Sequence, residues 1–433
     1  MMVRMREMSD ETQTLSPAAT DRTPVASLAS VESPAPRLTV WLTRLVIAGI
    51  VLAALNLRPA ITSLGALLEE ARVGLHMSGS VAGVLTSVPP LCFAIFGIAA
   101  PRLARRFGPG AVVCAGMVAI TTGLLIRPFA GGTAGFLAAS ALTLMGIAVS
   151  NVLMPVIVKR YFPDRVGSMT GLYSMALALG TSVAAAATVP MTEALGGSWR
   201  VGLAVWAVLA ALAVLPWIGM ARDRGAAARN TVAAQAQDSP APRITRSPTA
   251  WALGCFFGLQ ATGAYITMGW MPQIFRDAGV SAGTAGALLA VTMVMGVPLA
   301  FVIPRLATRM KTQGPIVVAL GLCGLTGYAG LFFAPAAGAW AWALLLGVSN
   351  CAFPLALTMI GMRSRTGAGV VRLSVFAQST GYLISTPGPL LVGVLYQHSG
   401  GWGLPIALMA GLIVPQIAVG ILAGRDRTIE DEC

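Results

Sequence analysis

The chain has 433 residues, of which 56% are hydrophobic and only 10% carry a charge. Soluble domains average about 25% charged residues, so this composition excludes an ordinary soluble enzyme, a disordered protein and a nucleic-acid-binding module. The net charge of +13 would on its own suggest a polyanionic partner such as DNA. With so few charged residues in total, the surplus instead indicates basic loops on a membrane protein.

Residues 1–39 are polar and rich in Ser, Pro, Ala and Thr, which predicts a disordered cytoplasmic tail. The long apolar runs that follow fit spans of about 20 residues each and lack the alternation of a β-barrel. They predict an all-α integral membrane protein with twelve transmembrane helices, at about 41–68, 79–101, 109–128, 133–158, 166–192, 198–221, 249–275, 281–303, 315–334, 338–361, 369–397 and 403–423.

The polar stretch at residues 222–248 is predicted to be a cytoplasmic linker between two six-helix halves, residues 40–221 and 249–424, with a short tail at 425–433. The loop PRLARRF at Pro101 recurs as PRLATRM at Pro304, and SNVLMP at Ser150 recurs as SNCAFP at Ser349. Shared helix-end chemistry is the alternative explanation. We interpret the echoes as a duplicated six-helix unit, which makes the halves pseudo-symmetric and places a small-molecule site between them near the midplane.

With both termini inside, 24 of the 29 Lys and Arg residues fall in inner segments, four fall in outer segments, and Arg58 lies within a span. Because basic residues concentrate on the cytoplasmic side, this asymmetry predicts a multi-pass protein of the inner cell membrane with both termini cytoplasmic.

Arg58 is the most informative residue, because a charge at the centre of a span costs about 2.5–3.5 kcal/mol on insertion scales. All 16 carboxylates lie in tails, loops or span ends, so no carboxylate at that depth neutralises it. A free guanidinium would attract an anion or a strong hydrogen-bond acceptor. The alternative is a structural role, in which Arg58 bonds carbonyls freed by Pro59. Asn56 could orient Arg58 or line the same cavity.

Further polar and aromatic residues in the spans are candidates for binding the same molecule. Gln260 is the counterpart of Arg58 under the repeat, and packing or interhelical hydrogen bonding is the alternative role for each residue. The complete set of candidate substrate-binding residues is Arg58, Asn56, Gln260, Tyr265, Trp270, Asn151, Asn350, Tyr173, Gln378 and Tyr382. The spans contain no metal-binding or acid–base cluster, so no catalytic residue, metal or cofactor is expected.

The loop PRLARRFG resembles the signature of the major facilitator superfamily in Leu103, Ala104, Arg106 and Gly108. Pro101 and Arg105 replace the first Gly and the Asp of that signature, so its carboxylate contact is missing here. The resemblance implies an inner gate formed by Arg102, Arg106, Arg305 and Arg309. The alternative is that these arginines, with Arg105, are topology determinants that meet anionic headgroups.

Four longer blocks resemble the cyanate permease/2-nitroimidazole transporter (CynX/NimT) branch of that superfamily: LNLRPAITSLGALL, SNVLMPVIVKRYFPDRVGSMTGLYS, FFGLQATGAYITMGWMPQI and FAQSTGYLISTPGPLLVGVLY. The resemblance implies a monomeric alternating-access transporter in the lipid bilayer that moves a small polar or anionic, cyanate-like solute. The alternative is efflux of small heteroaromatic compounds of the 2-nitroimidazole kind. Protons are a candidate coupling ion, and three options stay open: facilitated diffusion, coupling through Glu69, Glu70, Glu193 or a histidine at the outer end, or proton movement carried by the substrate.

Overall fold

The computed structural model describes residues 40–221 and 244–432, and every regular element in these ranges is a helix. The predicted tail at 1–39 and most of the predicted linker lie outside the described residues. Ten helical stretches are long and apolar enough to cross a membrane. Two other predicted spans, at 249–275 and 369–397, also form helices but fall outside that group. The all-helical fold class is therefore confirmed.

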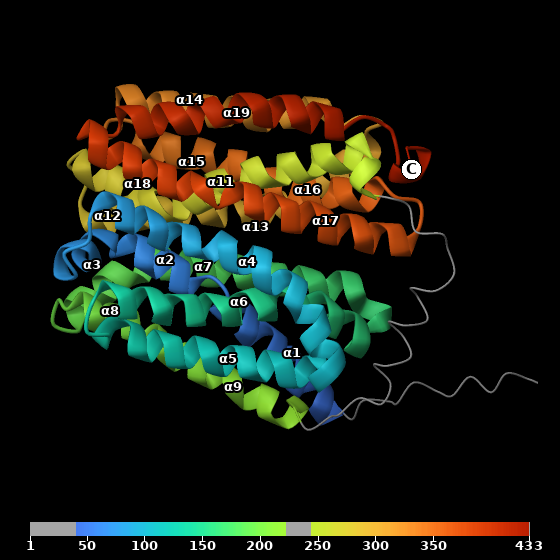
Figure 1. The fold of residues 1–433 in the computed structure, drawn as a ribbon, viewed down its shortest axis with the longest axis horizontal. Helices are drawn as coiled ribbons and strands as arrows, with labels where there is room; N and C mark the ends of the chain where they lie inside the picture. Colours follow the sequence, from blue (N-terminus) through green and yellow to red (C-terminus); the bar gives the residue numbers. More distant parts are fainter. Residues whose placement is uncertain (1–39, 222–243, 433) are drawn as a thin grey trace, which may run out of the picture. The chain divides into compact units, whose positions relative to one another are not determined.

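The described residues before and after the linker are called the N-half (40–221) and the C-half (244–432). In the N-half the helices are α1 (Val40–Asn56), α2 (Pro59–Ala66), α3 (Leu68–Gly74), α4 (Gly79–Phe107), α5 (Pro109–Ile126), α6 (Thr133–Tyr161), α7 (Val166–Ala194), α8 (Trp199–Ala204) and α9 (Trp206–Ala221), with short 3-10 turns η1 (Arg127–Phe129) and η2 (Pro163–Arg165). Figure 1 shows them in blue to green.

The C-half follows the same plan in yellow to red (Figure 1). Its helices are α11 (Pro248–Asp277), α12 (Ala282–Val294), α13 (Gly296–Arg309), α14 (Gly314–Phe333), α15 (Ala339–Asn350), α16 (Ala352–Met362), α17 (Gly367–Ser385), α18 (Pro387–Ser399) and α19 (Gly403–Ala423), with turns η3 (Ile244–Arg246) and η4 (Ile429–Asp431). The end of the bundle with the loops predicted to lie outside is called the outer end, and the opposite end is called the inner end.

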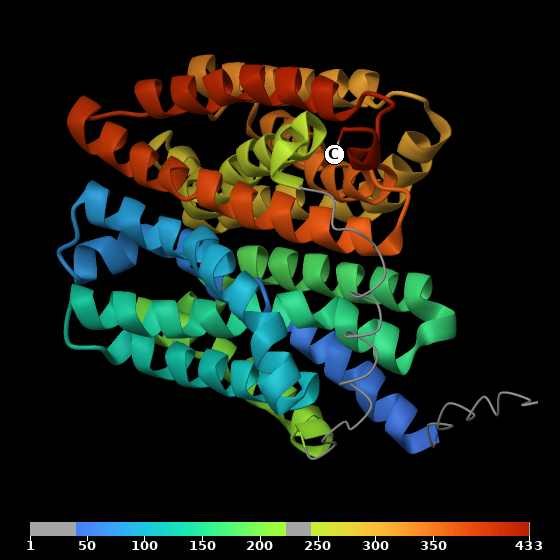
Figure 2. The same ribbon diagram turned by 45° about the vertical axis from the view of Figure 1, so that its right-hand side comes forward.

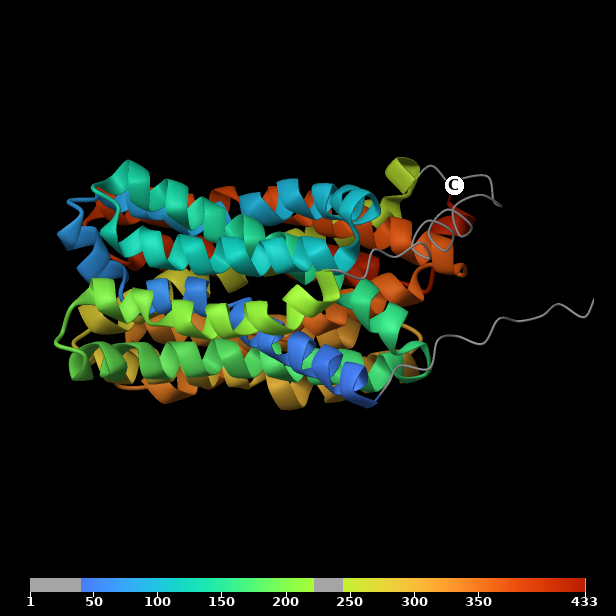
Figure 3. The ribbon, with the colours of Figure 1, turned by 90° about the horizontal axis from the view of Figure 1, so that it is seen from below.

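The first span is interrupted between α1 and α2, at Leu57 and Arg58. Pro59 causes this break, because proline has no N–H and its ring clashes with the carbonyl of Leu55 four residues earlier. That carbonyl lies against Gly180 of α7, where even one added methyl group would collide with it. Figure 3 shows blue α1 beside green α7, and the two helices pack together. Gly381 of α17 makes the equivalent close approach to α11 in the C-half.

Four other predicted spans are also divided into two helices, at Val205, Met295, Cys351 and Thr386. The span predicted at 369–397 breaks at Thr386, the first residue of a Thr-Pro-Gly-Pro sequence. The span predicted at 338–361 breaks at Cys351, next to the Asn350 carbonyl that Pro354 leaves without its usual partner. By contrast, α6 runs without interruption through Pro155. A proline in a span therefore weakens the helix here without always ending it.

Within the described residues, the hydrogen bonds and ion pairs that join the two halves lie toward the outer end. Gln397 of α18 accepts hydrogen bonds from the backbone and hydroxyl of Ser80 on α4, at 2.8 and 2.7 Å. Arg276 forms an ion pair with Glu70 at 2.9 Å. Gly83 of α4 packs so closely on α18 that an added Cβ would lie 2.9 Å from the Leu390 carbonyl oxygen. The two halves are thus closed against each other at this end.

At the inner end, the last residues of the chain bind the start of α11 and the loop before α17. Glu432 accepts hydrogen bonds from Ser247 at 2.5 Å and from the hydroxyl of Thr249 at 2.7 Å. Burial alone would raise the pKa of Glu432, but these hydrogen bonds outweigh it and hold that pKa below its usual range. Glu430 accepts from Ser364 at 2.5 Å. Figure 2 shows this C-terminal segment beside the inner end of the C-half.

The buried Arg363 braces the same end of the C-half. Its Nε donates to the Ala423 carbonyl at 3.0 Å, and its Nη2 donates to the side chain of Gln313. Gln313 in turn donates to two carbonyls at the end of α13, at 3.0 and 2.9 Å. Three helix ends, those of α13, α16 and α19, are therefore tied together.

Candidate functional site

The break in the first span presents Arg58 between the two halves. The side chain is partly exposed although it lies within the bundle. Its guanidinium carbon is 5.7 Å from the centre of the Phe93 ring, and its charge also acts on the hydroxyls of Tyr265, Tyr382 and Tyr173. No described carboxylate forms an ion pair with Arg58. Its positive charge therefore has aromatic and hydroxyl neighbours but no described counter-ion.

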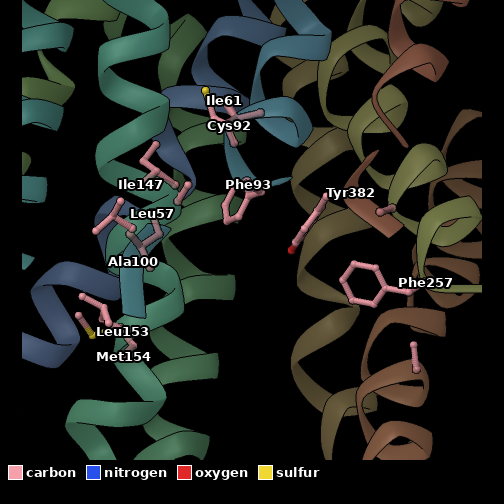
Figure 4. Close-up of a cluster of buried hydrophobic side chains, with 14 of the residues drawn as sticks. Leu57, Ile61, Cys92, Phe93, Ala100, Ile147, Leu153, Met154, Phe257 and Tyr382 are labelled. Carbon is pink, nitrogen blue, oxygen red and sulfur yellow. The ribbon is translucent and has the colours of Figure 1, made fainter. Parts of the chain in front are cut away.

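Aromatic rings from both halves line this site. The ring of Phe93 on α4 stacks on Tyr382 of α17, with centroids 5.0 Å apart and planes at 30°. Figure 4 shows Tyr382 between Phe93 and Phe257, and the centroid of Phe257 is 5.1 Å from that of Tyr382. Tyr265 of α11 lies 6.4 Å from both Phe93 and Tyr382. The Tyr265 hydroxyl is close to Arg58, but their geometry falls short of a hydrogen bond and leaves that hydroxyl without a partner among the described residues.

Two predicted N-half residues take different positions around Arg58. Tyr173 of α7, one of the hydroxyl groups near Arg58, donates a hydrogen bond to the side chain of Asn151 on α6. Asn56 points elsewhere, because its amide donates to the carbonyls of Leu52 at 2.7 Å and Leu209 of α9 at 3.1 Å. The structure thus brings Tyr173 and Asn151 to the site and uses Asn56 to tie α1 to α9.

Gln260 and Asn350 line a small cavity inside the C-half. The cavity lies between α11, α14, α15 and α19, and Thr267, Tyr328 and Gln416 contribute further polar groups to it. Gln260 is only 5% exposed and its side-chain oxygen has no partner among the described residues. At about 20 Å³ the cavity has room for about one water molecule, so it is too small for a substrate.

The other two candidates in the C-half, Trp270 and Gln378, form hydrogen bonds with residues other than Arg58. Trp270 is buried and donates to Thr86 of α4 at 3.2 Å, a contact that belongs to the closed outer end. Gln378 of α17 is partly exposed and donates to Ser374 on its own helix at 2.7 Å.

The loop arginines expected to form a gate are exposed at the inner end. Arg102 reaches only the carbonyl of Ile98 in its own helix, at 3.3 Å, and Arg106 lies over the ring of Phe107. Arg305 and Arg309 are exposed as well, and none of these four arginines pairs with a described carboxylate.

Sequence reasoning missed Phe93 and Phe257, which complete the aromatic lining. Phe93 follows the Pro89-Pro90 pair in α4, which is the pattern that could have drawn attention to it. Together, one guanidinium and several flat rings can hold a small planar molecule with a negative or electron-rich edge, since guanidinium groups bind such edges through two parallel N–H donors. Among the described residues, no group of three His, Cys, Asp or Glu side chains could hold a metal ion.

Comparison with known proteins identifies relatives along most of the chain. The chain is 36% identical to the uncharacterized transporter YycB of Bacillus subtilis over 88% of this chain and 94% of that protein. It is 33% identical to the 2-nitroimidazole transporter of Escherichia coli, over 88% of this chain and 96% of the relative. It is 30% identical to the cyanate transport protein CynX of Escherichia coli, over 84% of this chain and 94% of the relative.

The fold has solved counterparts as well. A bacterial homologue of the human lysosomal transporter Spinster matches with a TM-score of 0.73 at 16% identity, covering 90% of this chain and 98% of that one. Residues 45–371 also match the model of the Major Facilitator Superfamily. The chain is therefore a multi-pass membrane transporter rather than an enzyme. It belongs to the Major Facilitator Superfamily, in the branch that includes the 2-nitroimidazole transporter and CynX.

Proposed function

We propose that this transporter carries a small planar anionic or polar solute, of the cyanate kind, across the inner cell membrane by alternating access between its two six-helix halves. The observation that carries the proposal is the Arg58 guanidinium, which lies among rings from both halves without a described counter-ion. Arg58 would anchor the negative charge, and Phe93, Tyr265 and Tyr382 would pack on the faces of the solute. The relative CynX, a cyanate transport protein, supports this class of substrate.

The contacts between the halves support a state that would receive solute from the inner end. The described polar contacts between the halves lie toward the outer end, whereas Arg58 and Tyr173 remain partly exposed. In the opposite state the inner ends would close, and Arg102, Arg106, Arg305 and Arg309 would then be positioned to latch them. Both termini would lie in the cytoplasm, and one chain would suffice for transport because both walls of the site come from the same chain.

Uptake by proteoliposomes tests the substrate class. Radiolabelled cyanate should enter vesicles that contain the wild-type protein, and Arg58→Ala should raise the apparent KM by roughly 10- to 150-fold, because a hydrogen bond to a charged group contributes about 1.5–3 kcal/mol. Arg425→Ala, which removes an exposed arginine at the inner end, should leave uptake unchanged. Cyanate uptake by Arg58→Ala with wild-type KM and rate would contradict the proposal. An imposed pH gradient in the same vesicles tests whether protons are the coupling ion.

Efflux of a neutral heteroaromatic compound of the 2-nitroimidazole kind is the second candidate. The stacked Phe93 and Tyr382 rings favour it, because aromatic faces bind flat rings without needing a charge, and the 33% identical relative is a 2-nitroimidazole transporter. In this case Phe93→Leu would lower transport more than Arg58→Lys, and a strain without the gene would become more sensitive to the compound. If Arg58→Lys lowered transport more than Phe93→Leu, the result would favour an anionic substrate.

A further inference from the structure

A second arginine lies inside the N-half, at the outer end of α5. Arg127 is only 2% exposed, although it is one of the four basic residues that the predicted topology places in outer segments. Its Nη1 donates to the carbonyl of Ala60 on α2 at 3.1 Å, and its guanidinium lies over the Phe136 ring at 5.6 Å. Its Nε and Nη2 have no partner among the described residues, and no described carboxylate pairs with it.

The burial of Arg127 sets it apart from the other arginines at the outer end. Arg72 and Arg276 each pair with a glutamate and stay partly exposed. Burying a guanidinium without a counter-ion is costly, and a positive charge at the outer end works against the charge asymmetry that orients the protein. Neither solubility nor topology accounts for a buried arginine at position 127, which leaves its contact with the Ala60 carbonyl as the interaction that it supplies.

That contact falls two residues beyond Arg58, on the helix that begins at the break. Arg58 itself caps α2 without a side-chain hydrogen bond, and its carbonyl accepts from the amides of Ile61 at 2.9 Å and Thr62 at 3.1 Å, so the backbone of Arg58 moves with the first turn of α2. On the other side of the break, the amide of Asn56 donates to the Leu209 carbonyl at 3.1 Å. The two chain segments that flank Arg58 are therefore each tied by a buried side chain to a different neighbour.

The turn that carries Arg127 is itself fixed from the far side. Arg200 donates through Nε to the Pro128 carbonyl at 3.1 Å and lies over the Trp199 ring, whose neighbour is Phe136. Arg127 thus links this corner to α2 by a hydrogen bond, in addition to the direct packing of α8 on α2.

We propose that Arg127 is a positioning residue, which holds α2 through the Ala60 carbonyl and so aims Arg58 at the solute. This inference rests on the proposed role of Arg58 as the anchor. Arg127 does not touch the solute, and its effect on transport passes through Arg58.

A double-mutant cycle on Arg127 and Arg58 tests this role in cyanate uptake. Arg127→Met should raise KM about tenfold and change kcat less than twofold, because α2 would no longer hold Arg58 in its binding position. In the Arg58→Ala background, the same substitution should change KM less than twofold. Arg127→Lys, which keeps one donor for the Ala60 carbonyl, should have a KM between those of the wild type and Arg127→Met. It also replaces Arg127→Met in the cycle if that variant does not reach the membrane. Arg72→Met is the matched control, because it removes a charge from the same end without contacting α2.

Three results would be decisive against the inference. If Arg127→Met raised KM equally in both backgrounds, Arg127 would act independently of Arg58 and the positioning role would be wrong. If Arg127→Met and Arg127→Lys lowered kcat and the melting temperature together at unchanged KM, the residue would be structural only. If Arg58→Ala took up cyanate with the wild-type KM and rate, the proposed function would be wrong, and so would the inference that rests on it.

Discussion

Replacing Gly83 by alanine is expected to shift the transporter toward a state that is open at the outer end. A Cβ at this position would lie 2.9 Å from the Leu390 carbonyl oxygen and 3.0 Å from the Leu390 Cα. Both are backbone atoms that cannot rotate away, so α4 and α18 must separate. Overpacking of this kind costs about 1–3 kcal/mol. Because only the closed outer end bears that cost, the equilibrium between the two states should move about 5- to 150-fold.

Gly97→Ala is the matched control, because it places the same methyl group on the same helix. A Cβ at Gly97 would meet only the Val152 side chain, at an ordinary 3.8 Å. Both substitutions gain the same helix propensity from alanine, so the difference between them reports the contact with α18.

Distances between spin labels give the measurement. Labels at Val73 and Leu404, which are 59% and 56% exposed at the outer ends of the two halves, would be attached in a background without the native cysteines. Gly83→Ala should add a population with a longer distance, whereas Gly97→Ala should keep the wild-type distribution. If the two variants gave the same distribution, the contact between α4 and α18 would not be the surface that opens.

Three smaller predictions concern contacts between and within the halves. Glu70→Gln breaks a partly exposed ion pair with Arg276, worth about 0.2–1 kcal/mol, so the same labels should show at most a fivefold shift that disappears in high salt. Arg363→Met removes the donor to the buried side-chain oxygen of Gln313, at a cost of about 1–3 kcal/mol, and should lower the melting temperature by a few degrees. Glu432→Gln should lower the melting temperature at pH 7. Hydrogen bonds hold the pKa of Glu432 below its usual range in the folded protein. The contribution of Glu432 to the free energy of unfolding is therefore complete above a pH of about 4.3 and is lost as the pH falls through the folded pKa. At that low pH the melting temperatures of the wild type and Glu432→Gln should become equal. An unchanged melting temperature for Arg363→Met would contradict the contacts described. So would a difference in melting temperature between the wild type and Glu432→Gln that persists at low pH.

Hydropathy predicted the spans because each one must bury about 20 apolar residues, and the helices of the structure occupy those positions. The helix breaks were less predictable. Pro59 and Pro354 both coincide with interruptions, whereas α6 continues through Pro155. Proline removes one hydrogen bond in each case, but the packing of neighbouring helices decides whether the chain bends or breaks.

The site was predictable in part. Arg58 could be found from its charge alone, and Tyr265 and Tyr382 from their types and spans. Gln260 was expected, as the counterpart of Arg58 under the repeat, to lie in a span that faces the cavity between the halves. It lies five residues from Tyr265, which is about 140° around a helix, and lines a small cavity in the C-half. The rotation of a helix about its axis follows from packing between helices, which a single sequence does not specify. The burial of Arg127 escaped prediction for the same reason.

Direct binding to the purified protein is the sharpest test of Arg58 as the charge anchor. Calorimetric titration with cyanate should show binding by the wild type, and affinity about 10- to 150-fold weaker for Arg58→Gln, which keeps hydrogen-bond donors but loses the charge. Arg425→Gln should bind as the wild type does. Equal cyanate affinity for Arg58→Gln and the wild type would contradict the account.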